Sequence, residues 1–290
     1  MFAFMKIGIG LPNPVPHFPG TLIPTWAAAA EQRGFTTLAT IDRVAFPNHD
    51  SLISLAAAAA VTERIELLTN ILLLPTRDPV LIAKEAASVA SISAGRLTLG
   101  IGVGGREDDY TATGTSFAGR GKRADQMLDI MVAAWRGEPV AGSPEPVAPD
   151  VPGGTVPLLI GGGGDAGVRR TVKYGVGWTV GGAPPAQIAP LAARVRQAWT
   201  EAGREGEPRI LALGYFSIGD DVQDASYGYL RHYYGFLGEY AEMIAGGALR
   251  GAEAIKGSLK AYEDAGVDEL ILDPTVADLS QVERLADAVL

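Results

Sequence analysis

Eight short apolar runs, separated by longer segments of helical periodicity, dominate this chain of 290 residues. Most of these runs are rich in Val, Ile and Leu, as are the strands of a parallel sheet that is covered on both faces. We expect strands at Lys6 to Gly10, Thr37 to Ile41, Ile65 to Asn70, Leu97 to Gly102, Pro157 to Gly161, Gly177 to Val180, Ile210 to Ile218 and Glu269 to Asp273. Eight strand and helix units at this length predict a closed (β/α)8 TIM barrel, which we expect to form a single domain over residues 1–290.

The segments between these runs predict the surrounding helices. They are Ile23 to Arg33, Ser51 to Thr62, Pro79 to Ser93, Gly119 to Trp135, Ala166 to Tyr174, Ala186 to Ala202, Ala225 to Ala245 with Ala252 to Ala265, and Leu279 to Leu290. Two stretches break the alternation. Residues 137–155 are rich in Pro and Gly and predict a long loop. Residues 227–257 hold more helix than one barrel unit needs, which indicates an insertion near the C-terminal face.

Charge and cysteine content restrict the partners and the location of the protein. The formal net charge of -9 argues against nucleic acid or an anionic membrane surface as a partner. Without cysteine the chain has no disulfide, thiolate nucleophile or cysteine metal site, which fits a cytoplasmic protein. The opening residues, Met1 to Lys6, contain too few apolar side chains for a signal peptide or a membrane span.

A glycine run after the fifth expected strand predicts a phosphate-binding turn. Gly161 to Gly164 lie between strand and helix, Asp165 is a suitable N-cap, and amides at a helix start favour an anion. Three cations on the helix could add charge: Arg169, Arg170 and Lys173. A tight turn without ligand is the alternative. A Rossmann domain is disfavoured, because the next strand lacks the acidic residue at its end that binds ribose.

Polar side chains follow several of the expected strands. Asn13 follows the first strand, Asp42 and Arg43 the second, Asn70 the third, and Asp273 belongs to the end of the last. Active sites of such barrels lie where the strands end. We therefore expect these side chains to surround one site.

Other charged and aromatic residues fit structural roles. Glu107 to Asp109 are adjacent acids on an expected loop, and we interpret them as solvated charge and not as a metal site. His17 and His49 are expected on loops of the same face without a catalytic role. The aromatic cluster from His232 to Phe236 predicts packing or a substrate-pocket wall, and the tryptophans at 135 and 178 are expected in the core.

The run from Arg64 to Gly104, RIELLTNILLLPTRDPVLIAKEAASVASISAGRLTLGIGVG, resembles the signature region of the bacterial luciferase-like monooxygenase family. That family includes flavin- and F420-dependent oxidoreductases. The opening KIGIGLP, the segment GFTTLATIDR, the glycine run and the closing YEDAGVDELILDP are similar to the family in order and spacing. The resemblance covers nearly the whole chain.

The resemblance implies a luciferase-like barrel whose cofactor, reduced FMN or F420, lies across the C-terminal face. In this family the third strand often ends in a non-prolyl cis peptide against the cofactor ring, which here would join Asn70 to Ile71. The cofactor-binding residues implied by matching positions are Asn13, Asn70, Ile71, Gly102, Gly161, Gly162, Gly163 and Gly164.

Asp42 and Arg43 match the place where family members carry an acidic residue or histidine, followed by histidine, near the reactive edge of the ring. A proton is exchanged at that edge during redox chemistry. Arg43 cannot exchange it near neutral pH, so we expect Arg43 to hold anionic charge on the reduced ring or substrate. The alternative is an ion pair between Asp42 and Arg43 that caps the strand.

We expect an oxidoreductase or monooxygenase that acts on a small organic substrate, receives electrons from a flavin or F420 reductase, and forms a homodimer as relatives frequently do. One alternative is a flavin-binding barrel without turnover. Another is a phosphate-binding barrel enzyme such as an isomerase or aldolase. That class would need an interior lysine or carboxylate, and the only interior lysine is Lys6, at the wrong end of its strand.

Overall fold

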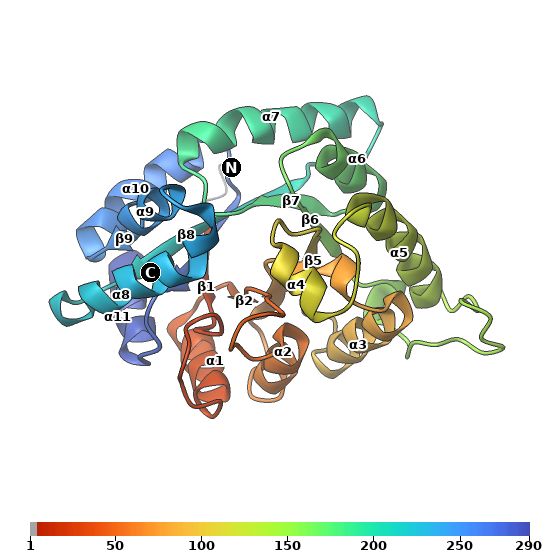
Figure 1. Ribbon diagram of the computed structural model, residues 1–290, viewed down its shortest axis with the longest axis horizontal. Helices are drawn as coiled ribbons and strands as arrows, with labels where there is room; N and C mark the ends of the chain where they lie inside the picture. Colours follow the sequence, from red (N-terminus) through yellow and green to blue (C-terminus); the bar gives the residue numbers. More distant parts are fainter. Residues whose placement is uncertain (1–4) are drawn as a thin grey trace.

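The computed structural model describes residues 5–290, so the prediction for Met1 to Phe4 lies outside the described residues. These residues form a closed parallel barrel with helices around it (Figure 1). The barrel strands are β1 (Lys6–Gly10), β2 (Thr37–Thr40), β3 (Glu66–Thr69), β5 (Leu97–Gly102), β6 (Leu158–Gly161), β7 (Gly177–Val180), β8 (Arg209–Ser217) and β10 (Glu269–Pro274). The predicted (β/α)8 barrel is confirmed, with strand ends shifted by at most one residue.

Pairing of the last strand with both of its neighbours closes the barrel. β10 pairs with β1, where Lys6 is opposite Glu269, and with β8, where Gly214 is opposite Leu272. Two short strands, β4 (Leu72–Leu73) beside β5 and β9 (Leu249–Arg250) beside β8, add to this sheet. The sequence did not predict them, because two residues carry no periodic signal.

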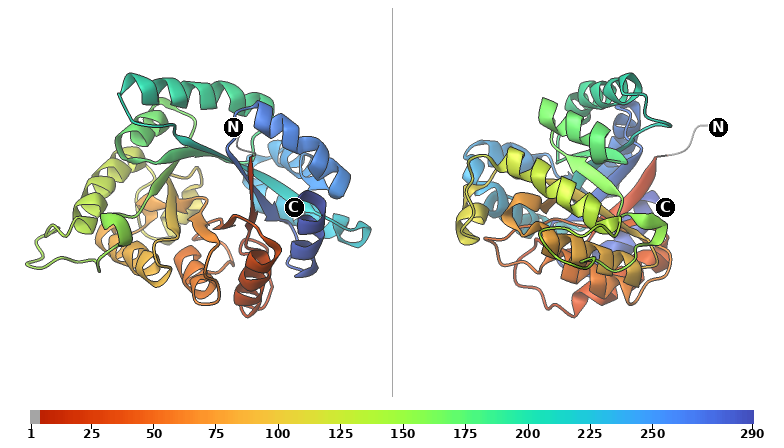
Figure 2. Two further views of the ribbon diagram at one scale, coloured as in Figure 1. Left: turned by 180° about the vertical axis from the view of Figure 1, so that it is seen from behind. Right: turned by 90° about the vertical axis from the view of Figure 1, so that its right-hand side faces the viewer.

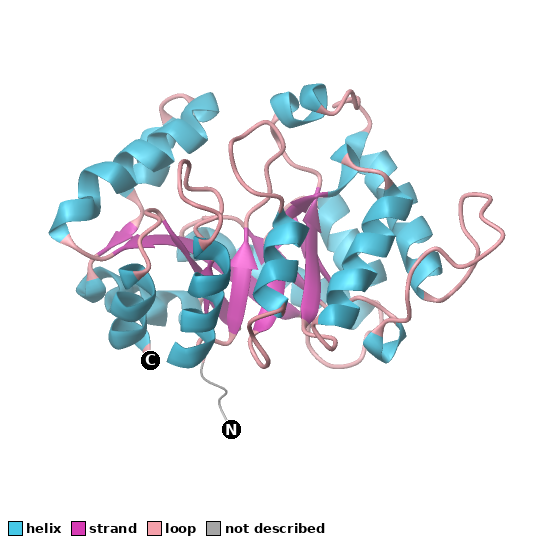
Figure 3. Cartoon of the chain, turned by 90° about the horizontal axis from the view of Figure 1, so that it is seen from below, coloured by secondary structure: helices cyan, strands magenta, loops and turns pink. Residues whose placement is uncertain are grey.

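Helices cover the outside of the barrel, as Figures 2 and 3 show from other directions. They are α1 (Leu22–Arg33), α2 (Ser51–Ala59), α3 (Pro79–Ile92), α4 (Glu107–Ala112), α5 (Arg120–Trp135), α6 (Asp165–Tyr174), α7 (Pro185–Glu201), α8 (Gln223–Tyr234), α9 (Tyr240–Gly246), α10 (Ala252–Asp264) and α11 (Ser280–Val289). Within residues 5–290, none of these helices has the length and apolar content needed to cross a bilayer.

Two departures from the predicted elements matter for the site, and one expected loop is confirmed. The expected helix over residues 225–245 is broken, because Gly238 adopts a φ of 58° between α8 and α9. The expected loop after β5 contains α4, which begins with three acidic residues. The expected loop over residues 137–155 is confirmed and projects from the side of the barrel (Figure 1), with only a short 3-10 turn at Pro152–Gly154.

Apolar side chains fill the barrel and the layer between strands and helices. A separate buried cluster joins five residues from different strands: Ala39, Leu68, Leu159, Leu211 and Ile271. A Cβ at Gly8 would lie 2.5 Å from Cδ1 of Ile271, so glycine at this position makes room for that side chain. Trp135 and Trp178 are buried in the larger core cluster, as predicted.

Charged residues at the start of three strands close the N-terminal end of the barrel. Arg209 donates from Nε to Glu269 at 3.0 Å and from Nη2 to Glu66 at 2.9 Å. The Glu269 side chain is only 1% exposed and also accepts from Thr36. Paired charges at this end of a barrel serve stability, because the chemistry of such folds lies at the opposite end.

Candidate functional site

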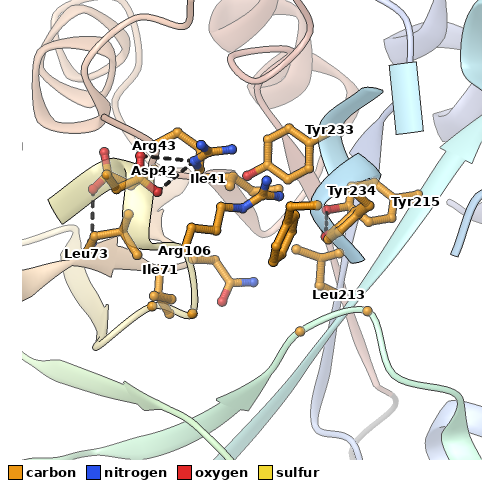
Figure 4. Close-up of a pocket in the computed structure, with 17 residues that line it drawn as sticks. Ile41, Asp42, Arg43, Ile71, Leu73, Arg106, Leu213, Tyr215, Tyr233 and Tyr234 are labelled. Atoms are coloured by element: carbon orange, nitrogen blue, oxygen red, sulfur yellow. Dashed lines mark hydrogen bonds and ion pairs between the residues drawn. The ribbon is translucent and has the colours of Figure 1, made fainter. Parts of the chain in front are cut away.

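A cavity of about 210 Å³ opens at the C-terminal ends of the strands (Figure 4). Its walls come from the ends of β2, β3, β5, β7 and β8 and from α8. The residues that line it are Ile41, Asp42, Arg43, Asn70, Ile71, Leu73, Gly104, Gly105, Arg106, Asp109, Gly181, Gly182, Leu213, Tyr215, Tyr233, Tyr234 and Phe236. The structure thus brings together four of the predicted site residues, Asp42, Arg43, Asn70 and Ile71.

Asp42 is buried and both of its carboxylate oxygens are engaged. Oδ1 accepts from Arg77 at 2.8 Å and from Ser51 at 3.1 Å, while Oδ2 accepts from the amide of Leu73 at 2.9 Å. Arg77 also binds Asp50 at 3.0 Å. Asp42 therefore fixes the backbone that follows β3, and its partner is Arg77 and not Arg43. The alternative of an Asp42–Arg43 ion pair is wrong.

Arg43 pairs instead with two acids on α4. Its Nε lies 2.8 Å from Asp109 and its Nη2 lies 2.8 Å from Asp108. The side chains of Arg43 and Asp109 are 4% and 1% exposed, and Asp109 also accepts from the amides of Val44 and Ala45. The interpretation of Asp109 as solvated charge is wrong, because α4 turns this carboxylate into the protein. Arg43 Nη1 has no hydrogen-bond partner among residues 5–290.

The peptide bond between Asn70 and Ile71 is cis, as the family resemblance implied. Asn70 Oδ1 accepts from the hydroxyl of Thr179 at 2.9 Å, whereas its buried Nδ2 has no partner within the described chain. A buried amide donor that no protein group satisfies is available to an acceptor in this cavity.

The Ile71 side chain explains two of the predicted glycines. A Cβ at Gly102 would lie 2.5 Å from Cδ1 of Ile71, and one at Gly161 would lie 3.3 Å from its Cγ2. Neither glycine lines the cavity itself. Gly102 and Gly161 therefore make room for the residue that does, which is a physical reason for glycine at both strand ends.

The glycine turn lies on the same rim, outside the walls of this cavity. Gly162 and Gly164 are exposed, and a Cβ at either would meet nothing within 4 Å. A Cβ at Gly167 would lie 2.2 Å from the carbonyl oxygen of Gly162, so glycine there lets α6 pack on the turn. The turn is therefore exposed at Gly162 and Gly164, whereas a Cβ at Gly163 would lie 3.3 Å from the side chain of Leu191.

Two expectations about this turn are corrected. Asp165 is the first residue of α6 and its carboxylate binds Arg194, so Gly164 occupies the N-cap position without a side-chain cap. Arg170 binds Asp125 at 2.6 Å and Lys173 binds Asp129 at 3.1 Å. These two cations attach α6 to α5 and are not directed at the turn.

Asn13 is buried and does not line the cavity. Its Nδ2 donates to the carbonyl of His49 at 2.8 Å, and its Oδ1 accepts from the amide of His49 at 3.1 Å. Asn13 therefore holds the loop that follows β2. His49 itself packs edge-on against Phe18, and His17 lines a different hollow, so both loop histidines lie away from this cavity.

Sequence reasoning missed several residues of the wall. Gly181 and Gly182 follow β7, and Tyr215 lies within β8, where its hydroxyl is 2.5 Å from that of Tyr234. Arg106 belongs to a charged segment for which the sequence predicts a solvated loop. Gly181 and Gly182 could have been predicted, because they directly follow a barrel strand on the rim where the other site residues lie.

Asp273 is fully buried beside the tyrosines, and its Oδ2 has no partner in the described residues. A Cβ at Gly10 would lie 1.7 Å from its Oδ1, so glycine on β1 provides the space for this carboxyl group. Burial raises the pKa of Asp273 well above its usual value. The carboxyl group is therefore neutral over a range of pH in which an exposed aspartate is ionised.

Because the folded-state pKa is raised, Asp273 favours folding only while it is protonated. The free energy of unfolding should decline as pH rises from about 4, the usual aspartate pKa, toward the raised value. We expect Asp273→Asn to remove this slope, as seen in urea denaturation at several pH values. Equal slopes in the variant and the parent protein would show that Asp273 is ionised in the folded state.

Comparisons with known proteins agree with this geometry. The sequence profile described as luciferase-like monooxygenase matches residues 3–289. The chain belongs to this family. An uncharacterised protein of Mycobacterium tuberculosis is 30% identical over 222 residues, which span 66% of this chain and 77% of that protein. Members of the luciferase-like family are oxidoreductases, so this chain is placed among enzymes.

Solved structures share the fold. The coenzyme F420-dependent tetrahydromethanopterin reductase from Methanopyrus kandleri superposes with a TM-score of 0.79 at 19% identity, covering 99% of each chain. A riboflavin lyase solved with modified FMN and riboflavin superposes with a TM-score of 0.75 at 16% identity, covering 98% of this chain and 91% of that one. At these identities the two structures show only that this luciferase-like chain shares their fold.

Proposed function

We propose that this protein binds reduced FMN or coenzyme F420 at the C-terminal rim of the barrel and uses it to oxidise or reduce a small organic substrate. The ring would lie against Ile71 in the cavity, and the phosphate would lie at the glycine turn after β6. The unsatisfied Nδ2 of Asn70 carries this proposal, since a buried amide without a partner calls for an acceptor from outside the chain.

The residues of the rim fit such a cofactor. Ring carbonyls and nitrogens are acceptors, which suits Asn70 Nδ2 and the open Nη1 of Arg43. Gly104, Gly105, Gly181 and Gly182 form wall without side chains, which permits close approach of a flat ring. At the turn, the exposed Gly162 and Gly164 leave main-chain amides accessible to a phosphate.

Bound at this rim, the cofactor supplies hydride transfer or, with FMN and oxygen, oxygenation. The chain would orient and stabilise it. Arg43 would hold negative charge on the reduced ring, with Asp109 and Asp108 fixing its guanidinium. Asp42 would position Leu73 and the backbone after the cis bond. The tyrosines of α8 and β8 would exclude water from the substrate side.

Other functions on the same fold have less support. An isomerase or aldolase of the lysine-dependent kind would need a lysine in the site, and among residues 5–290 the cavity wall includes none. A barrel that binds flavin without turnover would not need the guanidinium of Arg43 in the cavity wall.

Fluorescence titration of the purified protein with FMN and with F420 tests the proposal. We expect tight binding of one of them, and binding of neither would refute the function. Asn70→Leu should weaken that binding about 10-fold, because one buried hydrogen bond is lost. Thr179→Val is the matched control, since it removes the partner of Oδ1 and leaves Nδ2 in place. Equal weakening by both variants would assign Asn70 a structural role only.

The proposal includes a flavin or F420 reductase as electron source and a cytoplasmic location, which the absence of cysteine favours. It also includes a homodimer. Ile53 on α2 and Leu81 on the adjoining α3 are 71% and 58% exposed, and a second copy of the chain would cover such apolar side chains.

A further inference from the structure

Arg106 extends into the cavity opposite the strand ends. Its guanidinium carbon lies 3.9 Å from the ring centroid of Phe236, 4.5 Å from that of Tyr233 and 5.6 Å from that of Tyr234. Figure 4 shows the guanidinium beside the rings of Tyr233 and Tyr234. Stacking on aromatic faces fixes the plane of the guanidinium and leaves its N–H groups directed away from the rings.

The charges around the cavity are paired, apart from that of Arg106. Asp42 pairs with Arg77, and Arg43 pairs with Asp109 and Asp108. Within the described chain, Arg106 forms neither an ion pair nor a hydrogen bond of its side chain. Burial is the largest effect on Arg106 and lowers its pKa; the charge of Arg43 also lowers it, whereas Tyr233, Tyr234 and Asp108 partly offset the decrease. An anion in the cavity would relieve both effects.

A second, apolar hollow of about 340 Å³ borders this cavity. The two share Gly182, Leu213 and Tyr215, and the second is lined by apolar side chains of α9 and α10 such as Ile244 and Tyr262. A molecule that placed an anionic group at Arg106 could therefore extend an apolar body past Tyr215. The apolar lining of the hollow suits an aliphatic chain or a small aromatic ring.

We propose that Arg106 binds the carboxylate of the substrate, and that the substrate is an organic monocarboxylate whose apolar body fills the hollow between β8, α9 and α10. This inference rests on the proposed function, since it names the substrate class of the same site. The fork of a guanidinium matches a carboxylate with two parallel hydrogen bonds, which selects acids over the corresponding amides.

Hexanoate and its uncharged counterpart hexanamide are suitable probes, followed by ligand-observed NMR with the protein alone and with the protein saturated with FMN or F420. We expect hexanoate to bind the parent protein at least 10-fold more tightly than hexanamide. Arg106→Met should weaken hexanoate binding about 10- to 100-fold and leave hexanamide binding unchanged. Arg106→Lys should retain part of the preference. Arg136→Met, an exposed site at the end of α5, controls for the change in net charge.

Three outcomes would overturn the proposal. The first is a parent protein that does not prefer hexanoate. The second is an Arg106→Met variant that loses both probes equally, which indicates a packing role. The third is a variant that loses affinity for FMN but not riboflavin, or for F420 but not its phosphate-free deazaflavin fragment, which assigns the anion to the cofactor. A parent protein that binds neither FMN nor F420 refutes the proposed function instead, and hexanoate binding can still be measured without them.

Discussion

Replacing Arg209 with methionine is expected to lower the free energy of unfolding by about 3 kcal/mol. Glu269 would remain at the closed end of the barrel with its side chain 1% exposed and without its cation. Removing one partner of a buried ion pair destabilises a protein strongly, because the other charge stays out of water. We take the lower end of that range, since the Arg209 side chain is 21% exposed. Urea denaturation of the two proteins measures the difference.

Two further variants separate charge from packing in this experiment. Glu66→Gln removes the more exposed carboxylate, at 39%, and should change stability by less than about 1 kcal/mol. Adding Glu269→Gln to Arg209→Met removes the stranded charge and should recover part of the loss. If the double variant is no more stable than the single one, the loss comes from packing of the arginine stem and not from Glu269.

The barrel could be predicted from sequence because its pattern is local. Most strands are largely apolar runs, and two of them end in glycine, at Gly102 and Gly161. The position of Asp42, Arg43 and Asn70 on one rim then follows from parallel strand direction alone. The cis bond after Asn70 came from family resemblance, since no local pattern predicts it.

The partners within the site could not be predicted, because they depend on contacts between distant segments. Arg43 meets Asp109 across 66 positions of the chain. The sequence predicts solvated charge for adjacent acids such as Glu107 to Asp109. Only the packing of α4 against the loop after β2 turns Asp109 inward. Arg106 was overlooked for the same reason, since its aromatic partners lie on α8 and beyond it.

Replacing Arg43 with methionine is expected to lower the free energy of unfolding by about 3 to 5 kcal/mol and to lower the midpoint potential of the bound cofactor. The first effect follows because Asp109, 1% exposed, would lose its cation. The second follows if Arg43 stabilises the reduced, anionic ring. Loss of a charged hydrogen bond would weaken binding of the reduced form about 10- to 100-fold, or about 30 to 60 mV for two electrons.

Asp109→Asn added to Arg43→Met distinguishes the two roles of the arginine. The amide oxygen of asparagine can still accept from Val44 and Ala45, so the backbone of this loop keeps its acceptor. With the stranded charge removed, stability should largely return, whereas the potential should stay low. Recovery of both would mean that Arg43 acts only as the partner of Asp109. A low potential in a stable double variant would instead require a direct interaction of the guanidinium with the ring, through the nitrogen that Asp108 and Asp109 leave open.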